Sequence, residues 1–128
     1  MSSYSDYLEN KVLDHVLGTT AFTMPATVYV GLYTAAPSDS GGGTEVSGGA
    51  YARQAITFSA AAAGTTNNSA VVTFPTATAN WGTITHFALF DASTAGNMLM
   101  WSALTTSRVV NTNDIVKFSA GSLTVTQT

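Results

Sequence analysis

Hydrophobic residues near the N-terminus recur every four positions, which is the spacing of one face of an α-helix. They are Tyr4, Leu8, Val12 and Val16, and Leu13 and Leu17 lie beside them. Ser3 or Ser5 can cap the start of such a helix, and Gly18 stands where a left-handed stop belongs. The spacing therefore predicts a helix over about residues 3–17, as the only long helix of the chain.

After Gly18 the hydrophobic pattern changes to alternation, which is typical of β-strands. In the first such segment Val28, Val30 and Leu32 share one face, and Tyr29 lies on the other. Seven segments carry this type of pattern: 26–35, 51–59, 69–75, 82–92, 96–105, 114–119 and 122–128. Many short strands separated by Gly, Ser and Thr favour a sandwich or a barrel.

Two of these segments are apolar on both faces, within residues 84–90 and 98–104. Such strands are covered on both sides, and the linker 91–97 between them predicts a hairpin. The pattern contains no internal repeat and no boundary for a second domain. We predict a mainly β, single-domain antiparallel β-sandwich of about seven strands, with one N-terminal helix, over residues 1–128.

The stretch "PSDSGGGTEVSGGAYARQ" (37–54) holds five of the eleven glycines. A phosphate-binding loop needs a following helix and usually a Lys, and this stretch has neither. A calcium loop needs several carboxylates, and here only Asp39 and Glu45 supply them, beside Ser40 and Thr44. We interpret residues 37–50 as a strand-to-strand connection, flexible in the free subunit and ordered by a neighbouring one.

Charged residues make up 9% of the chain, and the four basic residues are scattered along it. Binding to nucleic acid or to an anionic membrane surface depends on clustered Lys and Arg, so neither partner is expected. The chain has no Cys, which excludes disulfides and thiolate metal sites. The N-terminus lacks the apolar core of a signal peptide, so we expect a protein assembled in a cytosol.

The candidate chemical groups do not form a recognisable motif. His15 and His86 lie far apart, and each is more simply explained as a packed residue. We therefore expect no enzyme, no metal and no cofactor. Arg53 predicts an ion pair with Glu45 or Asp91, and the alternative is a contact with a partner's carboxylate. Trp81 and Trp101 are interpreted as core or interface anchors.

Four stretches, taken together, carry a resemblance to a known family. They are "YLENKVLDHVLG", "PATVYVGLYTAAPSD", "GTEVSGGAYARQAITF" and "FPTATANWGTITHFALFDA". In this order they resemble a family of small virion proteins of tailed bacteriophages, commonly labelled phage tail fibre proteins. The resemblance covers nearly the whole chain. It implies a structural component of the particle, on the tail or on the capsid as a decoration (cement) protein, with no catalytic residues.

Residues and resemblance together give one main hypothesis. The protein is a non-enzymatic, repeated accessory subunit of the virion surface, assembled in the host cytoplasm, which contacts capsid or tail subunits and forms homo-oligomers. The candidate interface residues are Tyr4, Leu8, Val12, Val16 and Arg53. The alternative is a receptor- or carbohydrate-binding sandwich module at a tail tip. An exposed row formed by Tyr29, Tyr33, Tyr51 or Trp81 would support that alternative.

Overall fold

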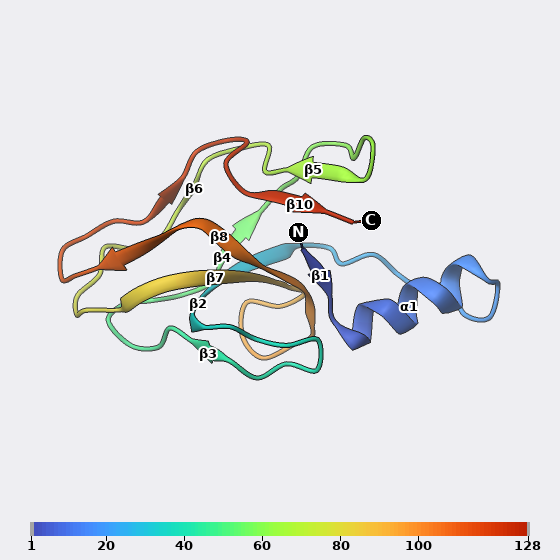
Figure 1. Cartoon of the computed structure of the whole chain (residues 1–128), viewed down its shortest axis with the longest axis horizontal. Coiled ribbons are helices and arrows are strands. Elements are labelled where there is room, and N and C mark those ends of the chain that lie inside the picture. The colour runs from blue at the N-terminus through green and yellow to red at the C-terminus, as the bar shows by residue number, and fades with distance from the viewer. Residues whose placement is uncertain (1, 128) are drawn as a thin grey trace.

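The computed structural model describes residues 2–127, in which one helix and ten strands follow one another (Figure 1). The elements are β1 (Ser3–Tyr4), α1 (Asp6–Val16), β2 (Val28–Ala35), β3 (Thr44–Glu45), β4 (Gln54–Ile56), β5 (Thr65–Asn67), β6 (Val72–Thr73), β7 (Gly82–Phe90), β8 (Met98–Val110), β9 (Lys117–Phe118) and β10 (Thr124–Thr126). The described chain is 41% strand and 9% helix, which confirms the mainly β prediction.

The strands form one large sheet and two small ones, and all the pairings are antiparallel. The large sheet has the order β1-β8-β7-β2-β3, and β4 also pairs with β2. The small sheets are β10-β5 and β6-β9. The long strands β7 and β8 are joined by the hairpin predicted from the linker, which is closed by a hydrogen bond from the Asp91 N–H to the Asn97 carbonyl.

The main hydrophobic core lies between the large sheet and the two small sheets. From the large sheet it takes side chains such as Val30, Leu32 and Ile84, and from the opposite side Phe74 and Phe118. The Phe74 and Phe118 rings meet edge to face, with their centroids 6.2 Å apart. Burial of these large side chains is the main stabilising term of the fold.

The other face of the large sheet is covered as well. Tyr33, Ala88 and Phe90 form a second buried cluster there, against which Met98 and Trp101 pack. Strand β7 therefore contributes to both clusters, because successive side chains of a strand point to opposite faces. This explains why residues 84–90 are apolar at almost every position and confirms that the strand is covered on both sides.

Each of the seven segments predicted from alternation contains a strand, and three strands of two or three residues (β1, β3 and β5) were missed. The predicted start of the helix at residue 3 was wrong. Tyr4 pairs with Met100 in β1, so the helix begins at Asp6. Ser5 caps it by accepting a hydrogen bond from the Leu8 N–H at 3.2 Å, as one of the two predicted caps.

Candidate functional site

Helix α1 projects from one end of the β body (Figure 1). Only its first turns are attached. The Ser5 N–H donates to the Leu99 carbonyl at 2.9 Å, and the Asp6 N–H donates to the Asp39 carbonyl at 2.8 Å. Leu8 is the buried residue of the helix. The second half of the helix and the segment that follows it therefore extend beyond the sheets.

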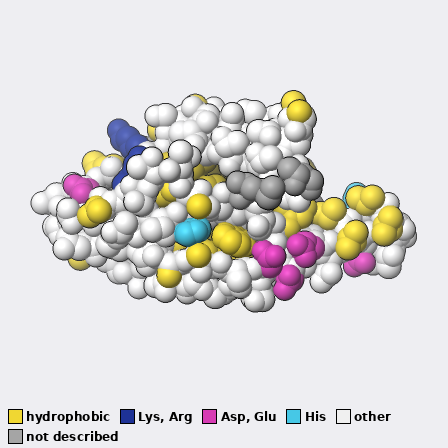
Figure 2. Space-filling model, in the orientation of Figure 1, with side chains coloured by type: hydrophobic (Ala, Val, Ile, Leu, Met, Phe, Trp, Pro, Cys, Tyr) yellow, Lys and Arg dark blue, Asp and Glu magenta, His cyan; other side chains and the backbone are white. Residues whose placement is uncertain are grey.

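Large apolar side chains gather at this projecting end. Leu13, Val16, Leu17 and Met24 are 56%, 70%, 74% and 81% exposed. Figure 2 shows hydrophobic side chains at the tip and acidic side chains near the base of the helix. We call these four residues the helix-end surface. Burying them against a partner would contribute roughly 1.5–3 kcal/mol per fully covered side chain.

The structure divides the predicted apolar stripe into two parts. Tyr4 lies in β1 and Leu8 packs against the body, whereas Val12 is half-buried and Val16 is exposed. Leu8 also lines an open apolar cavity of about 210 Å³, together with Val28, Phe58, Thr66, Leu89, Leu99, Met100 and Val125. The stripe thus passes from the chain's own core at its start to solvent at its end.

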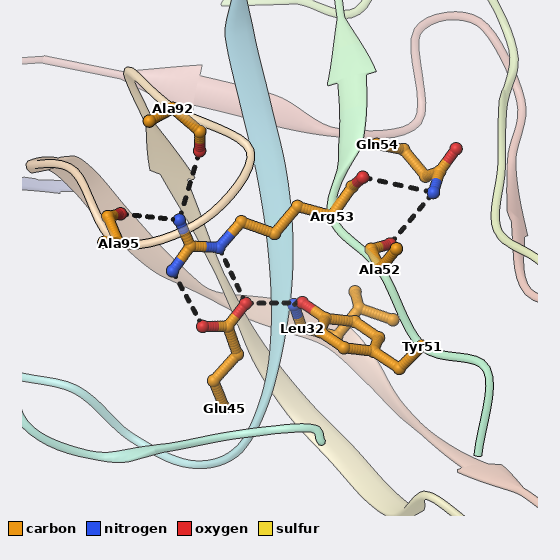
Figure 3. A network of polar contacts seen from close by, with 8 residues as sticks. All are labelled: Leu32, Glu45, Tyr51, Ala52, Arg53, Gln54, Ala92 and Ala95. Atoms are coloured by element: carbon orange, nitrogen blue, oxygen red, sulfur yellow. Dashed lines mark hydrogen bonds and ion pairs between the residues drawn. The ribbon is translucent and has the colours of Figure 1, made fainter. Parts of the chain in front are cut away.

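Arg53 lies at the centre of a polar network on the second face of the large sheet (Figure 3). Its Nε and Nη2 atoms donate to the two carboxylate oxygens of Glu45, both at 2.8 Å. Its Nη1 atom donates to the carbonyls of Ala92 and Ala95 at 3.1 and 2.9 Å. The guanidinium carbon lies 3.4 Å from the centroid of the Phe90 ring. The network ties three distant segments together and confirms the predicted ion pair with Glu45.

The same network also supplies a hydrogen bond to the backbone of strand β2, at a point between its two neighbouring strands. The Tyr51 hydroxyl donates to Glu45 at 2.7 Å and accepts the Leu32 N–H at 3.0 Å, between the stretches that pair with β4 and β3. Gly31 leaves room for this arrangement. A Cβ there would lie 2.8 Å from Glu45 Oε2 and 3.1 Å from the Tyr51 hydroxyl. The sequence did not indicate this role for Tyr51 or Gly31, because the role depends on contacts across the sheet.

Burial and hydrogen bonding act in opposite directions on these groups. Burial raises the pKa of the Glu45 carboxyl, but the hydrogen bonds from Arg53 and Tyr51 outweigh it, so the pKa lies below its ordinary value. Burial raises the pKa of Tyr51, and its hydrogen bond to Glu45 raises it further. Burial lowers the pKa of Arg53, but its hydrogen bond to Glu45 more than compensates. The ion pair is therefore fully charged at neutral pH.

Most of the Arg53 guanidinium faces the chain itself, since 9% of the side chain is exposed. Its predicted contact with a partner's carboxylate stays a prediction. The network instead gives Arg53 a positioning role for β3 and for the turn at residues 92–95.

The Gly-rich segment connects two strands, as predicted, but it contains strand β3. Pro37 and Val46 are buried, and Gly49 accepts a hydrogen bond from Trp81 Nε1 at 2.9 Å. The proposed calcium ligands do not converge, because Glu45 is bound to Arg53 and Asp39 accepts from Trp101 Nε1 at 3.0 Å. That assembly orders the exposed part of this segment stays a prediction.

The other groups weighed in the sequence lie apart from one another. His15 accepts the Phe22 N–H at 3.0 Å, and His86 contacts Thr85 and Trp101. Within residues 2–127, no three His, Asp or Glu side chains gather as a metal site would require. In the same part of the chain, no helix has both the length and the apolar character to cross a membrane.

The aromatic residues that would support a carbohydrate-binding surface do not form an exposed row. Tyr33 and Trp81 are 6% exposed and belong to the two buried clusters. Tyr51 packs against Trp81, with ring centroids 5.4 Å apart, and Tyr29 is half-buried in β2. The helix-end surface is therefore the best candidate for a functional contact.

Comparison with known proteins assigns the chain to a family. Residues 3–126 match the model of a family described as "Podophage GP4 fiber I protein gp80". No curated protein matches the chain.

Proposed function

Because the chain belongs to the podophage GP4 fiber I protein gp80 family, we propose that it is a repeated, non-enzymatic subunit of a tail fibre, held on the particle by its helix-end surface. The family is one of fibre proteins, so the subunit is a structural component of the phage virion and associates with other tail proteins. The family's name favours a place on the tail over one on the capsid, which sequence alone left open.

One observation carries the proposal. Leu13, Val16, Leu17 and Met24 are all more than half exposed, in the second half of the projecting helix and in the segment that follows it. A monomer gains nothing from this arrangement, because solvated apolar side chains contribute little to folding. A subunit that docks is stabilised on its partner, because docking removes these side chains from water. We place Val16 in the docking contact, Val12 at its edge, and Leu8 and Tyr4 at the base that holds the helix.

The test is complementation of a phage whose own copy of this chain is disrupted. A chain carrying both Leu13→Ser and Leu17→Ser should fold normally and be missing from purified particles. Val71→Ser is the matched control, because Val71 is 59% exposed but lies before β6, on the body. Normal amounts of the double variant in particles would contradict the proposal.

Point variants are preferable here to removal of the N-terminus up to Gly18. Strand β1 pairs with β8 through Ser3 and Tyr4, and Leu8 is buried against the body. Truncation would therefore uncover an edge of the large sheet and damage the fold along with the docking surface.

A further inference from the structure

Charge is distributed unevenly between the two ends of the molecule. Four of the seven acidic residues belong to the helix end, where Lys11 is the only Lys or Arg up to residue 39. These acidic residues are Asp6, Glu9, Asp14 and Asp39. Asp6 and Glu9 are exposed. Figure 2 shows acidic side chains gathered at the base of the helix and, at the opposite end of the body, basic side chains with an acidic one beside them.

The opposite end carries the complementary features. Arg108 and Lys117 are exposed, and Arg108 donates to the Lys117 carbonyl at 3.1 Å, so the two residues lie side by side. The one ion pair among residues 2–127 is Arg53–Glu45, so neither base has an acidic partner in the described chain. Ile115 adds an apolar side chain that is 51% exposed, and the exposed Asp114 precedes it. We call Arg108, Ile115 and Lys117 the basic end.

We propose that the helix-end surface and its acidic base dock on the basic end of a second copy of this chain, so that subunits join head to tail. This inference rests on the proposed function and names the partner of the docking surface. Apolar side chains then meet apolar side chains, and Glu9 and Asp6 approach Arg108 and Lys117. Charge complementarity of this kind sets the orientation and excludes the wrong pairing.

The distribution of charge disfavours a two-fold dimer through either end. Two helix ends would bring acidic groups together, and two basic ends would bring Arg108 and Lys117 together, which is repulsive in both cases. A contact between two different surfaces leaves one of each free on the pair. Such heterologous contacts continue into a ring or an open filament. A contact that can be repeated from one copy to the next suits a repeated fibre component.

The test is sedimentation of the purified full-length chain over a range of concentrations, with single charge reversals at each end. The wild-type chain should form species larger than a dimer, and association should weaken with added salt. Glu9→Lys places a base opposite Arg108 and Lys117 in the proposed contact, and Lys117→Glu places an acid opposite Asp6 and Glu9. Each variant alone should associate about tenfold more weakly or worse.

The decisive measurement is the association of an equimolar mixture of the two variants. The lysine at position 9 of one variant then faces the glutamate at position 117 of the other, and the remaining contact is the wild-type one. Association should therefore return to near the wild-type level. Ala61→Lys, on the exposed turn before β5, is the control for an added charge and should leave association unchanged.

Other outcomes would overturn the inference. A wild-type chain that stays monomeric, a chain that stops at a dimer, or a mixture that does not recover would each contradict head-to-tail docking. If the monomeric chain still enters particles through the helix-end surface, the occupant is another virion protein. In that case this inference fails and the proposed function stands.

Discussion

Arg53 and Leu17 are both long side chains outside the main core, yet 9% of the Arg53 side chain and 74% of Leu17 are exposed. Arg53 reaches Glu45 and the carbonyls of Ala92 and Ala95, so the chain itself satisfies it. Leu17 lies at the end of a helix that leaves the body. The comparison teaches that a polar side chain can be bonded entirely within the chain, while an apolar side chain stays exposed and available for contact with another molecule.

The largest expected effect lies in the body. Phe74 is 1% exposed and contacts Tyr51, Trp81 and Phe118. Phe74→Ala should lower the free energy of unfolding by about 3–5 kcal/mol, because it removes buried surface and leaves a cavity. Urea unfolding followed by Trp fluorescence measures this. A loss below about 1 kcal/mol would mean that the core is not where the fold places it.

The next effect concerns the Arg53 network. Arg53→Met leaves the Glu45 carboxylate half-buried without its ion-pair partner and should cost about 2 kcal/mol of unfolding free energy. Combining Arg53→Met with Glu45→Leu should cost less than the sum of the two single changes, because the unpaired charge is gone. Strict additivity in this double-mutant cycle would contradict direct coupling of the two side chains.

The pH dependence follows from the direction of the Glu45 shift. Since the folded pKa of Glu45 lies below its ordinary value of 4.5, its contribution is present above pH 4.5 and is lost as the pH falls through the folded value. Unfolding free energy should therefore decrease below pH 4.5. Glu45→Gln should be less stable than wild type at neutral pH and should show a shallower decrease on acidification. Parallel pH profiles would rule out this role for Glu45.

The smallest effect on folding is expected at the helix end. Leu17→Ser should change the unfolding free energy by no more than about 0.5 kcal/mol, because the side chain is solvated and its N–H still bonds to the Leu13 carbonyl. Urea unfolding of the monomeric chain at low concentration checks this. A loss comparable to that of Phe74→Ala would place the helix end in the core and remove the contrast between the two regions.

The sequence predicted the elements whose pattern is local and periodic. Alternation located the β2 segment and both long strands of the hairpin, and the four-residue spacing located the helix. Strand β1 was missed because its residues fit the helical stripe, and β3 and β5 were missed because their residues are all polar and show no apolar alternation. Tyr4 fitted the helical stripe, but its backbone pairs with Met100, and such a long-range contact leaves no local mark.

The candidate site was predicted in the same uneven way. The apolar stripe named the right helix, but spacing alone could not tell that Leu8 packs on the body while Val16 remains exposed. Glu45 was one of the two predicted ion-pair partners of Arg53. The choice depended on the course of residues 37–50, which contain a strand that the Gly-rich composition concealed. Met24 lies outside the predicted helix and belonged to no proposed interface, although it is 81% exposed.

Met24 offers the most direct test of the central claim that the helix end is a docking surface. It is 81% exposed, whereas Met98 and Met100 are half-buried and serve as internal references. Oxidative footprinting of the free subunit and of the intact particle compares how far solvent reaches each methionine. We predict that Met24 is oxidised readily in the free subunit and is strongly protected in the particle, because a partner excludes the oxidant from a covered side chain. Equal oxidation of Met24 in both forms would contradict the account.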